Sequence, residues 1–153
     1  MNVAISRLGP EDTDRMRKLN ALFATEFGDA ANYASVPPGD AHLRRVLGQD
    51  GVIALTSCDG DEIVGGLVAY VLDKLEQERS EIYIYDLAVA RAHRRRGLAT
   101  ALIGELQALA SGIGAWVIYV QADHGDEPAI ALYEKLGVRE DVMHFDIPPR
   151  ATR

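Results

Sequence analysis

Apolar residues recur at the spacing of amphipathic helices in four segments of the chain. The clearest segment places five apolar side chains on one helical face, namely Met16, Leu19, Leu22, Phe23 and Phe27. We expect this helix to open at Gly9-Pro10-Glu11-Asp12, because proline and acidic residues favour the first turn, and to end at Gly28-Asp29. The other predicted helices are one carrying Leu43, Val46 and Leu47 and two spanning residues 98–110 and 129–136.

Six further runs are rich in β-branched and aromatic residues, which is typical of strands. The second and third are separated by Cys58-Asp59-Gly60-Asp61, and an Asp-Gly pair readily adopts the positive φ angles of a tight turn, so we expect a hairpin there. Residues 30–40 contain Pro37-Pro38-Gly39 and are predicted to form a loop. The six predicted strands span residues 3–6, 52–57, 62–72, 81–89, 115–121 and 142–147.

These elements follow one another in the order β-α-α-β-β-β-α-β-α-β. Such an order predicts an α/β sandwich with a mixed central sheet flanked by helices, and not a regular doubly wound sheet. No internal repeat, low-complexity segment or linker divides the sequence. We therefore expect a single domain over residues 1–153.

Charge and cysteine usage limit the classes of function. The chain has 23 acidic and 16 basic residues, and a net charge of −7 disfavours a nucleic-acid binder and suits a cationic small molecule. Cys58 is the only cysteine, which suits a reducing cytoplasm, and no Cys/His cluster has the spacing of metal ligands. The first residues lack a basic region followed by an apolar run, and the longest apolar stretch, residues 67–72, is too short to cross a bilayer. We expect no signal peptide, no membrane span and no metal.

A strongly basic junction at residues 87–100 joins a predicted strand to a predicted helix. The first N–H groups of a helix have no intrahelical acceptor and lie at the positive end of its dipole, which favours a bound diphosphate. Gly97 and Ala99 would let the backbone approach the phosphates closely. The Walker and dinucleotide glycine patterns are both absent there. An exposed basic turn is the alternative, but the Arg-x-x-Gly-x-Ala spacing after a strand favours a phosphate cradle.

This junction resembles the central motif of the GNAT superfamily of acyl-coenzyme A-dependent N-acyltransferases, Arg/Gln-x-x-Gly-x-Gly/Ala. The resemblance implies that acetyl-coenzyme A is the acetyl donor. It also implies that the strand backbone binds the pantetheine arm and that the loop binds the pyrophosphate. The family often has Pro in place of Arg91 and Gly in place of Arg95. The implied donor-binding residues are Leu87, Ala88 and Val89 for the pantetheine and Arg94, Arg95, Arg96, Gly97, Leu98, Ala99 and Thr100 for the pyrophosphate.

Residues 126–138 resemble the second signature of the family, Asn-x-x-Ala-x-x-Leu-Tyr-x-Lys-x-Gly-Phe. In the family this tyrosine points at the sulfur of the donor, which makes Tyr133 the expected catalytic acid. A phenol can protonate the thiolate that leaves when an amine attacks the thioester. A core aromatic is the alternative for Tyr133, and Asp126 replaces the usual asparagine.

An acidic and aromatic strand precedes the expected pantetheine-binding residues. Strict alternation would put Glu81, Tyr83 and Tyr85 on one face and Asp86 on the other, unless a bulge intervenes, and this strand is usually bulged in the superfamily. A carboxylate beside the thioester could take a proton from a substrate ammonium. We expect Asp86 to be this base; a strand-end acid bound to a backbone amide is the alternative.

Segments spread over nearly the whole chain resemble a narrower group, the type I aminoglycoside 3-N-acetyltransferases. They include Arg7-Leu8-Gly9-Pro10 and the strand at residues 80–89. The resemblance implies acetyl transfer to the 3-amino group of the deoxystreptamine ring of gentamicin-like antibiotics, and so antibiotic resistance. Such polycations need a cleft with carboxylates. The residues expected to bind substrate are Glu26, Asp29, Glu81, Tyr83, Asp123, Asp126, Glu127 and Asp146.

Three other functions remain open from the sequence. A polyamine or protein-amine acetyltransferase needs the same donor site. A non-catalytic acyl-coenzyme A sensor would be favoured by loss of the tyrosine or a broken pyrophosphate loop, and the sequence has both the tyrosine and the loop. A nucleic-acid-binding module is disfavoured by the net charge. A homodimer is common in the superfamily, although no segment of this sequence indicates an interface.

Overall fold

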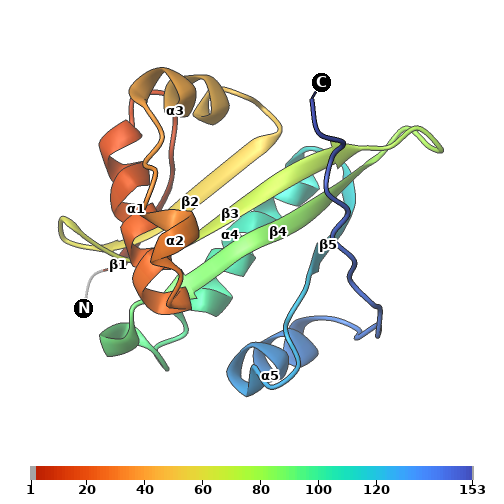
Figure 1. Ribbon diagram of the computed structural model, residues 1–153. Coiled ribbons are helices and arrows are strands. Elements are labelled where there is room, and N and C mark those ends of the chain that lie inside the picture. The colour runs from red at the N-terminus through yellow and green to blue at the C-terminus, as the bar shows by residue number, and fades with distance from the viewer. Residues whose placement is uncertain (1–2, 153) are drawn as a thin grey trace. The chain divides into compact units, whose positions relative to one another are not determined.

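The computed structural model describes residues 3–152, which group into two compact units that meet in sequence between Gln121 and Ala122. The N-terminal unit is built on a five-stranded sheet in the order β1-β2-β3-β4-β5 (Figure 1). Neighbouring strands are antiparallel except β4 and β5, which are parallel, so the predicted mixed sheet is confirmed. The strands are β1 (Val3–Arg7), β2 (Val52–Asp59), β3 (Glu62–Asp73), β4 (Ser80–Val89) and β5 (Ala115–Val120).

Helices cover both faces of this sheet (Figure 1). One face carries α1 (Thr13–Phe27), α2 (Ala30–Tyr33) and α3 (Asp40–Leu47), and α4 (Leu98–Gly112) covers the other. A short 3-10 turn, η1 (Arg91–His93), lies between β4 and α4. The core on the α1 side joins buried residues from helices and strands, namely Leu8, Met16, Leu19, Phe23, Leu43, Leu47, Ala54, Val68 and Ala88.

Helix α1 packs closely on the sheet because β3 has a glycine beneath it. A Cβ on Gly66 would lie 2.3 Å from Cδ1 of Leu19, so only glycine allows this approach. The helix ends as predicted at Gly28, which is left-handed with a φ of 61°. It begins at Thr13, later than expected, because Asp12 accepts a hydrogen bond from the Gly9 N–H and holds the preceding residues in a turn.

Two local predictions concern turns. The hairpin between β2 and β3 is confirmed, with Gly60 at a φ of 62° and both strands longer than expected. The loop predicted at residues 30–40 is wrong at its start, because Ala30–Tyr33 forms one helical turn. Asp29 accepts a hydrogen bond from the Asn32 N–H, and this cap stabilises the turn.

The C-terminal unit contains α5 (Glu127–Leu136), whose N-cap Asp126 accepts a hydrogen bond from the Ala129 N–H. The strand predicted at residues 142–147 is wrong, since residues 137–152 form neither helix nor strand. Alternation of apolar residues predicts a face, but a strand also needs a neighbour for its N–H and C=O groups, and this unit provides none. Its apolar side chains Val142, Met143, Phe145 and Ile147 are exposed.

No helix within residues 3–152 is long and apolar enough to cross a bilayer. The same residues contain no group of three or more His, Cys, Asp or Glu side chains arranged to hold a metal ion.

Candidate functional site

A β-bulge in β4 decides which side chains share a face of the sheet. Val68 pairs with Asp86 and the next residue, Ala69, pairs with Ile84, so Tyr85 is the extra residue. The bulge expected in this strand is therefore confirmed. Ile84 lies on the α4 face, whereas Asp86 lies with Val68 on the α1 face. Because of the bulge, Asp86 shares a face with Glu81 and Tyr83.

Asp86 is half-buried and hydrogen-bonded to a tyrosine from α2. The Tyr33 hydroxyl donates to Oδ1 of Asp86. Burial raises the pKa of the Asp86 carboxyl above its usual range, although the Tyr33 hydrogen bond opposes this shift. Burial and the Asp86 carboxylate together raise the pKa of Tyr33. A carboxylate that holds its proton more strongly than usual is a better base, and the role of Asp86 as the base stays a prediction.

Sequence reasoning missed Tyr33, because the segment was predicted to be a loop. Its ring packs edge-on against Phe23 and Phe27, with centroid distances of 5.9 and 5.5 Å. The recurring aromatic residues of α1 were the one available signal, since two stacked phenylalanines at a helix end offer a surface for a third ring. Asp29, an expected substrate ligand, caps the same turn and lies close enough to raise the pKa of Tyr33 further.

Tyrosines surround Asp86 along β3, β4 and β5. Tyr83 stacks on Tyr119 at a centroid distance of 4.7 Å, and its hydroxyl donates to Oε1 of Gln121 at 2.7 Å. Tyr85 packs edge-on against both Tyr70 and Tyr83, at 5.9 and 5.6 Å. Glu81, half-buried, lies on the same face two residues before Tyr83. The expected substrate residues of this strand, Glu81 and Tyr83, thus lie on the same face of the sheet as Asp86.

The edge of β4 that faces β5 opens beyond the bulge. Pairing between β4 and β5 runs from Ser80 only as far as Ile84, and within the described residues no strand pairs with that edge after it. On the other side, Leu87, Ala88 and Val89 remain paired with β3. An edge without a neighbouring strand presents N–H and C=O groups, of which the Val89 carbonyl already accepts from Nε of Arg94, and the others can bind the amides of an extended arm such as pantetheine.

The loop after β4 presents helix N–H groups to open space. Arg95 and Gly97 are both left-handed, with φ angles of 61° and 75°, and α4 begins at Leu98. The first intrahelical bond is donated by Ala101 to the Gly97 carbonyl, so the N–H groups of Leu98, Ala99 and Thr100 have no intrahelical acceptor. A Cβ on Gly97 would meet nothing within 4 Å. The loop therefore fits a diphosphate, and the left-handed Arg95 explains why glycine suits that position in the family.

Arg94 and Glu26, expected to bind the pyrophosphate and the substrate, form an ion pair with each other. Arg94 Nη2 donates to Oε2 of Glu26 at 2.6 Å, and its Nε donates to the Val89 carbonyl at 3.3 Å. Glu26 also accepts the Arg91 N–H at 3.2 Å, and its side chain is only 12% exposed. The two side chains hold the end of α1 to the loop. The phosphate contact expected of Arg94 and the substrate contact expected of Glu26 stay predictions.

The C-terminal unit carries the remaining expected residues. Asp126 caps α5 and its N–H donates to the Asp123 carbonyl, while Glu127 lies in the first turn. Asp146 is exposed and contacts Nε2 of His144 at 2.8 Å. Burial, followed by the Asp126 carboxylate, raises the pKa of Tyr133, so this phenol keeps its proton at neutral pH. That these residues meet Asp86 stays a prediction of the sequence.

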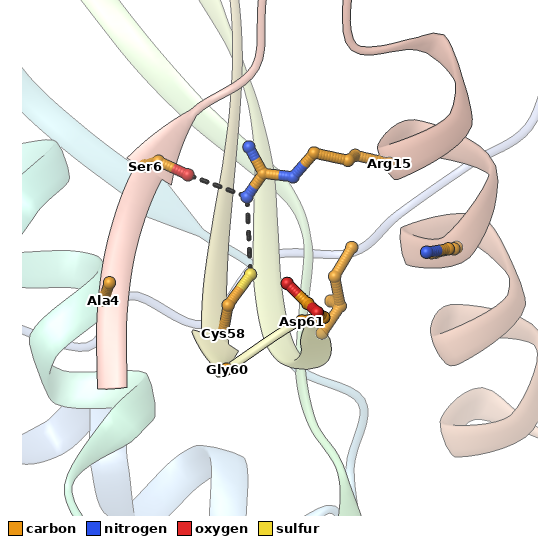
Figure 2. A pocket seen from close by; sticks show the side chains of 8 residues that line it. Ala4, Ser6, Arg15, Cys58, Gly60 and Asp61 are labelled. Carbon is orange, nitrogen blue, oxygen red and sulfur yellow. Dashed lines mark hydrogen bonds between the residues drawn. The ribbon is translucent and has the colours of Figure 1, made fainter. Parts of the chain in front are cut away.

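A cavity of about 490 Å³ lies away from Asp86, between β1, the β2–β3 hairpin and α1 (Figure 2). Arg15 extends into it from α1, and its Nη2 donates to Ser6 Oγ at 2.9 Å and to Cys58 Sγ at 3.3 Å. None of the expected catalytic or binding residues lines it; its lining is Ala4, Ser6, Arg15, Lys18, Cys58, Gly60, Asp61 and Ile63.

Solved structures similar to the chain include two aminoglycoside acetyltransferases from uncultured soil metagenomic samples. One is 55% identical, with 98% of this chain and 100% of that chain covered and a TM-score of 0.96. The other, solved in complex with sisomicin, is 30% identical, with 97% of each chain covered and a TM-score of 0.89.

Curated relatives match a smaller part of the chain. A mycothiol acetyltransferase of Kocuria rhizophila is 36% identical over 54% of this chain and 24% of its own length. An N-alpha-acetyltransferase of Sulfurisphaera tokodaii is 29% identical over 52% of this chain and 54% of its own length. The chain thus spans about a quarter and about half of these two relatives.

The sequence profile of the Acetyltransferase (GNAT) family matches residues 16–138, which include the bulged strand, the basic loop and α5. Enzymes of this family are N-acetyltransferases that use acetyl-coenzyme A as the acetyl donor. The profile match covers most of the sequence and agrees with the fold, and the chain belongs to the GNAT acetyltransferase family.

Proposed function

We propose that the chain is an aminoglycoside 3-N-acetyltransferase that acetylates gentamicin-like antibiotics in a reducing cytoplasm and so confers resistance. The observation that carries this proposal is the position of Asp86, a half-buried carboxyl group on a face lined with tyrosines and Glu81. Full-length similarity to two aminoglycoside acetyltransferases, one of them bound to sisomicin, supports it. A cationic amino sugar matches both the acids of this face and the net charge of −7.

The residues divide the reaction between a base, an acid and a donor site. Acetyl-coenzyme A supplies an acetyl group activated as a thioester. The open edge of β4 and the start of α4 hold the donor, with the pantetheine arm along residues 87–89 and the pyrophosphate at Gly97 and the first N–H groups of α4. Asp86 takes the proton of the substrate ammonium, and the free amine forms the new C–N bond as the C–S bond breaks. Tyr133 gives its phenol proton to the departing sulfur, and the second N–H proton, which the nitrogen loses as it becomes an amide, restores the phenol.

A second candidate is acetylation of a protein or polyamine amine. The N-alpha-acetyltransferase relatives favour it, but they match only about half of the chain. The acidic, tyrosine-rich face would bind a polyamine as well as an amino sugar.

The position of the new amide tests the finer part of the proposal. We expect sisomicin to be acetylated once, on the 3-amino group of its deoxystreptamine ring, as read from the NMR spectrum of the purified product. Acetylation of another amine would keep the substrate class and overturn the regiochemistry.

Glu26→Gln is expected to raise the KM for acetyl-coenzyme A about fivefold with little change in kcat. The substitution removes the charge that holds Arg94 and accepts the Arg91 N–H, so the loop loses part of its preorganisation. Asp40→Asn is a matched control, because Asp40 also forms an ion pair with an arginine, Arg17 of α1, at 2.5 Å but lies away from the loop. Equal KM values for Glu26→Gln and Asp40→Asn would contradict a role for Glu26 in placing the loop.

A further inference from the structure

Four tyrosines form a continuous aromatic surface on the α1 face of the sheet. We call it the tyrosine platform and define it by Tyr70 of β3, Tyr83 and Tyr85 of β4 and Tyr119 of β5. Each ring contacts another member, through the pairs Tyr70–Tyr85, Tyr83–Tyr85 and Tyr83–Tyr119. The register supports the cluster, since Tyr83 lies opposite Tyr70 on one side and Tyr119 on the other.

The platform adjoins the expected base because of the bulge. In a regular strand without the bulge, Asp86 would follow the alternation of Ile82 and Ile84 and lie on the α4 face. With it, Tyr85 and Asp86 are consecutive residues that lie close to the same rings. Asp86 is near enough to Tyr70 and Tyr83 to raise the pKa of both phenols.

Much of this aromatic surface is open. The Tyr85 side chain is 62% exposed and Tyr70 is 37% exposed, whereas large aromatic side chains normally bury most of their area. Tyr83 and Tyr119 are half-buried. Their raised pKa values keep the Tyr70 and Tyr83 phenols neutral, so they can donate hydrogen bonds as well as accept them.

The chemistry of the platform selects among amines. An exposed ring face attracts ammonium groups and the C–H-rich faces of sugar rings, and phenol hydroxyls pair with sugar hydroxyls. A linear polyamine has the charges but no ring to stack. The adjoining carboxylates Asp86 and Glu81 complement the positive charge.

We propose that the tyrosine platform is the binding surface for a sugar ring of a cationic amino sugar, with Tyr85 as its principal stacking contact and the reacting amine directed to Asp86. This assignment rests on the proposed function. The tyrosine platform would also explain substrate specificity, because stacking on a sugar ring, and not charge alone, would distinguish aminoglycosides from polyamines.

The test measures binding of sisomicin and of spermidine to the full chain by isothermal titration calorimetry. Tyr85→Leu removes the aromatic ring and Tyr85→Phe keeps it, and both should fold because the side chain is largely exposed. Trp116→Leu is the matched control: Trp116 is 53% exposed on β5, but strand alternation puts it on the opposite face from Tyr119. Thermal melting verifies that each variant is folded.

We expect Tyr85→Leu to raise the Kd for sisomicin about tenfold and the Kd for spermidine by much less. Tyr85→Phe should stay within about threefold of the parent chain, and Trp116→Leu should leave both values unchanged. Equal losses for sisomicin and spermidine in Tyr85→Leu, or no loss for sisomicin, would overturn the platform while leaving aminoglycoside acetylation intact. A parent chain that binds spermidine but not sisomicin would instead overturn the proposed function itself.

Discussion

Replacing Asp86 by asparagine is expected to lower kcat/KM for an amine substrate by about 10²-fold to 10³-fold, the loss typical of removing a general base. The amide oxygen of asparagine can still accept the Tyr33 hydrogen bond, so the local structure should persist. The deficit should be largest below neutral pH, where more of the substrate amine is protonated and needs a base. Steady-state rates measured between pH 5.5 and 9 would check both expectations.

The effect of Asp86→Asn on thermal stability distinguishes a catalytic role of Asp86 from a structural one. Burial raises the pKa of Asp86 in the folded state, so the charged carboxylate opposes folding at every pH above that raised value. Asparagine is neutral at every pH and removes this opposition, and the melting temperature at pH 7.5 should be unchanged or higher. As a control, Asp73→Asn alters a carboxylate that accepts a hydrogen bond from Ser80 elsewhere in the sheet and should leave the rate intact. An unaltered pH–rate profile for Asp86→Asn would rule out Asp86 as the general base.

Replacing Tyr133 by phenylalanine is expected to lower kcat about 10²-fold while changing the KM for acetyl-coenzyme A by less than about threefold. The substitution removes one hydroxyl and keeps the ring, so packing of α5 should be preserved. Burial and the Asp126 carboxylate raise the pKa of Tyr133, so the parent enzyme should keep its acid protonated at neutral pH.

A thiol assay and a donor-binding titration distinguish the outcomes for Tyr133→Phe. A normal kcat would show that the sulfur takes its proton from elsewhere. A large rise in the KM for acetyl-coenzyme A at constant kcat would instead make Tyr133 a binding residue.

The sheet, its hairpin and the helices on both faces followed from local patterns in the sequence. The apolar face of α1 and the Asp-Gly turn each depend on a few residues that are neighbours in the sequence. They could therefore be predicted without knowing which other elements they pack against. The strand expected at residues 142–147 failed because its alternation is equally local, whereas a strand requires a partner elsewhere.

The candidate site was predictable only where a motif or a bulge was expected. Asp86 and Tyr83 lie together because one extra residue, Tyr85, shifts the alternation, and the resemblance made that shift an expectation. The pairing of Glu26 with Arg94 joins residues 68 positions apart, and that of Tyr33 with Asp86 joins residues 53 apart. The amino-acid sequence does not indicate such contacts, since any carboxylate of the chain could have paired with any arginine or any tyrosine hydroxyl.

The most direct test of the account is release of free thiol from acetyl-coenzyme A with sisomicin, spermidine and a peptide with a free N-terminus assayed in parallel. We expect kcat/KM to be highest for sisomicin by at least about tenfold, because only the amino sugar offers rings to the face that carries Asp86. Turnover of spermidine or the peptide with none for sisomicin would contradict the aminoglycoside assignment and leave the family and the donor site in place.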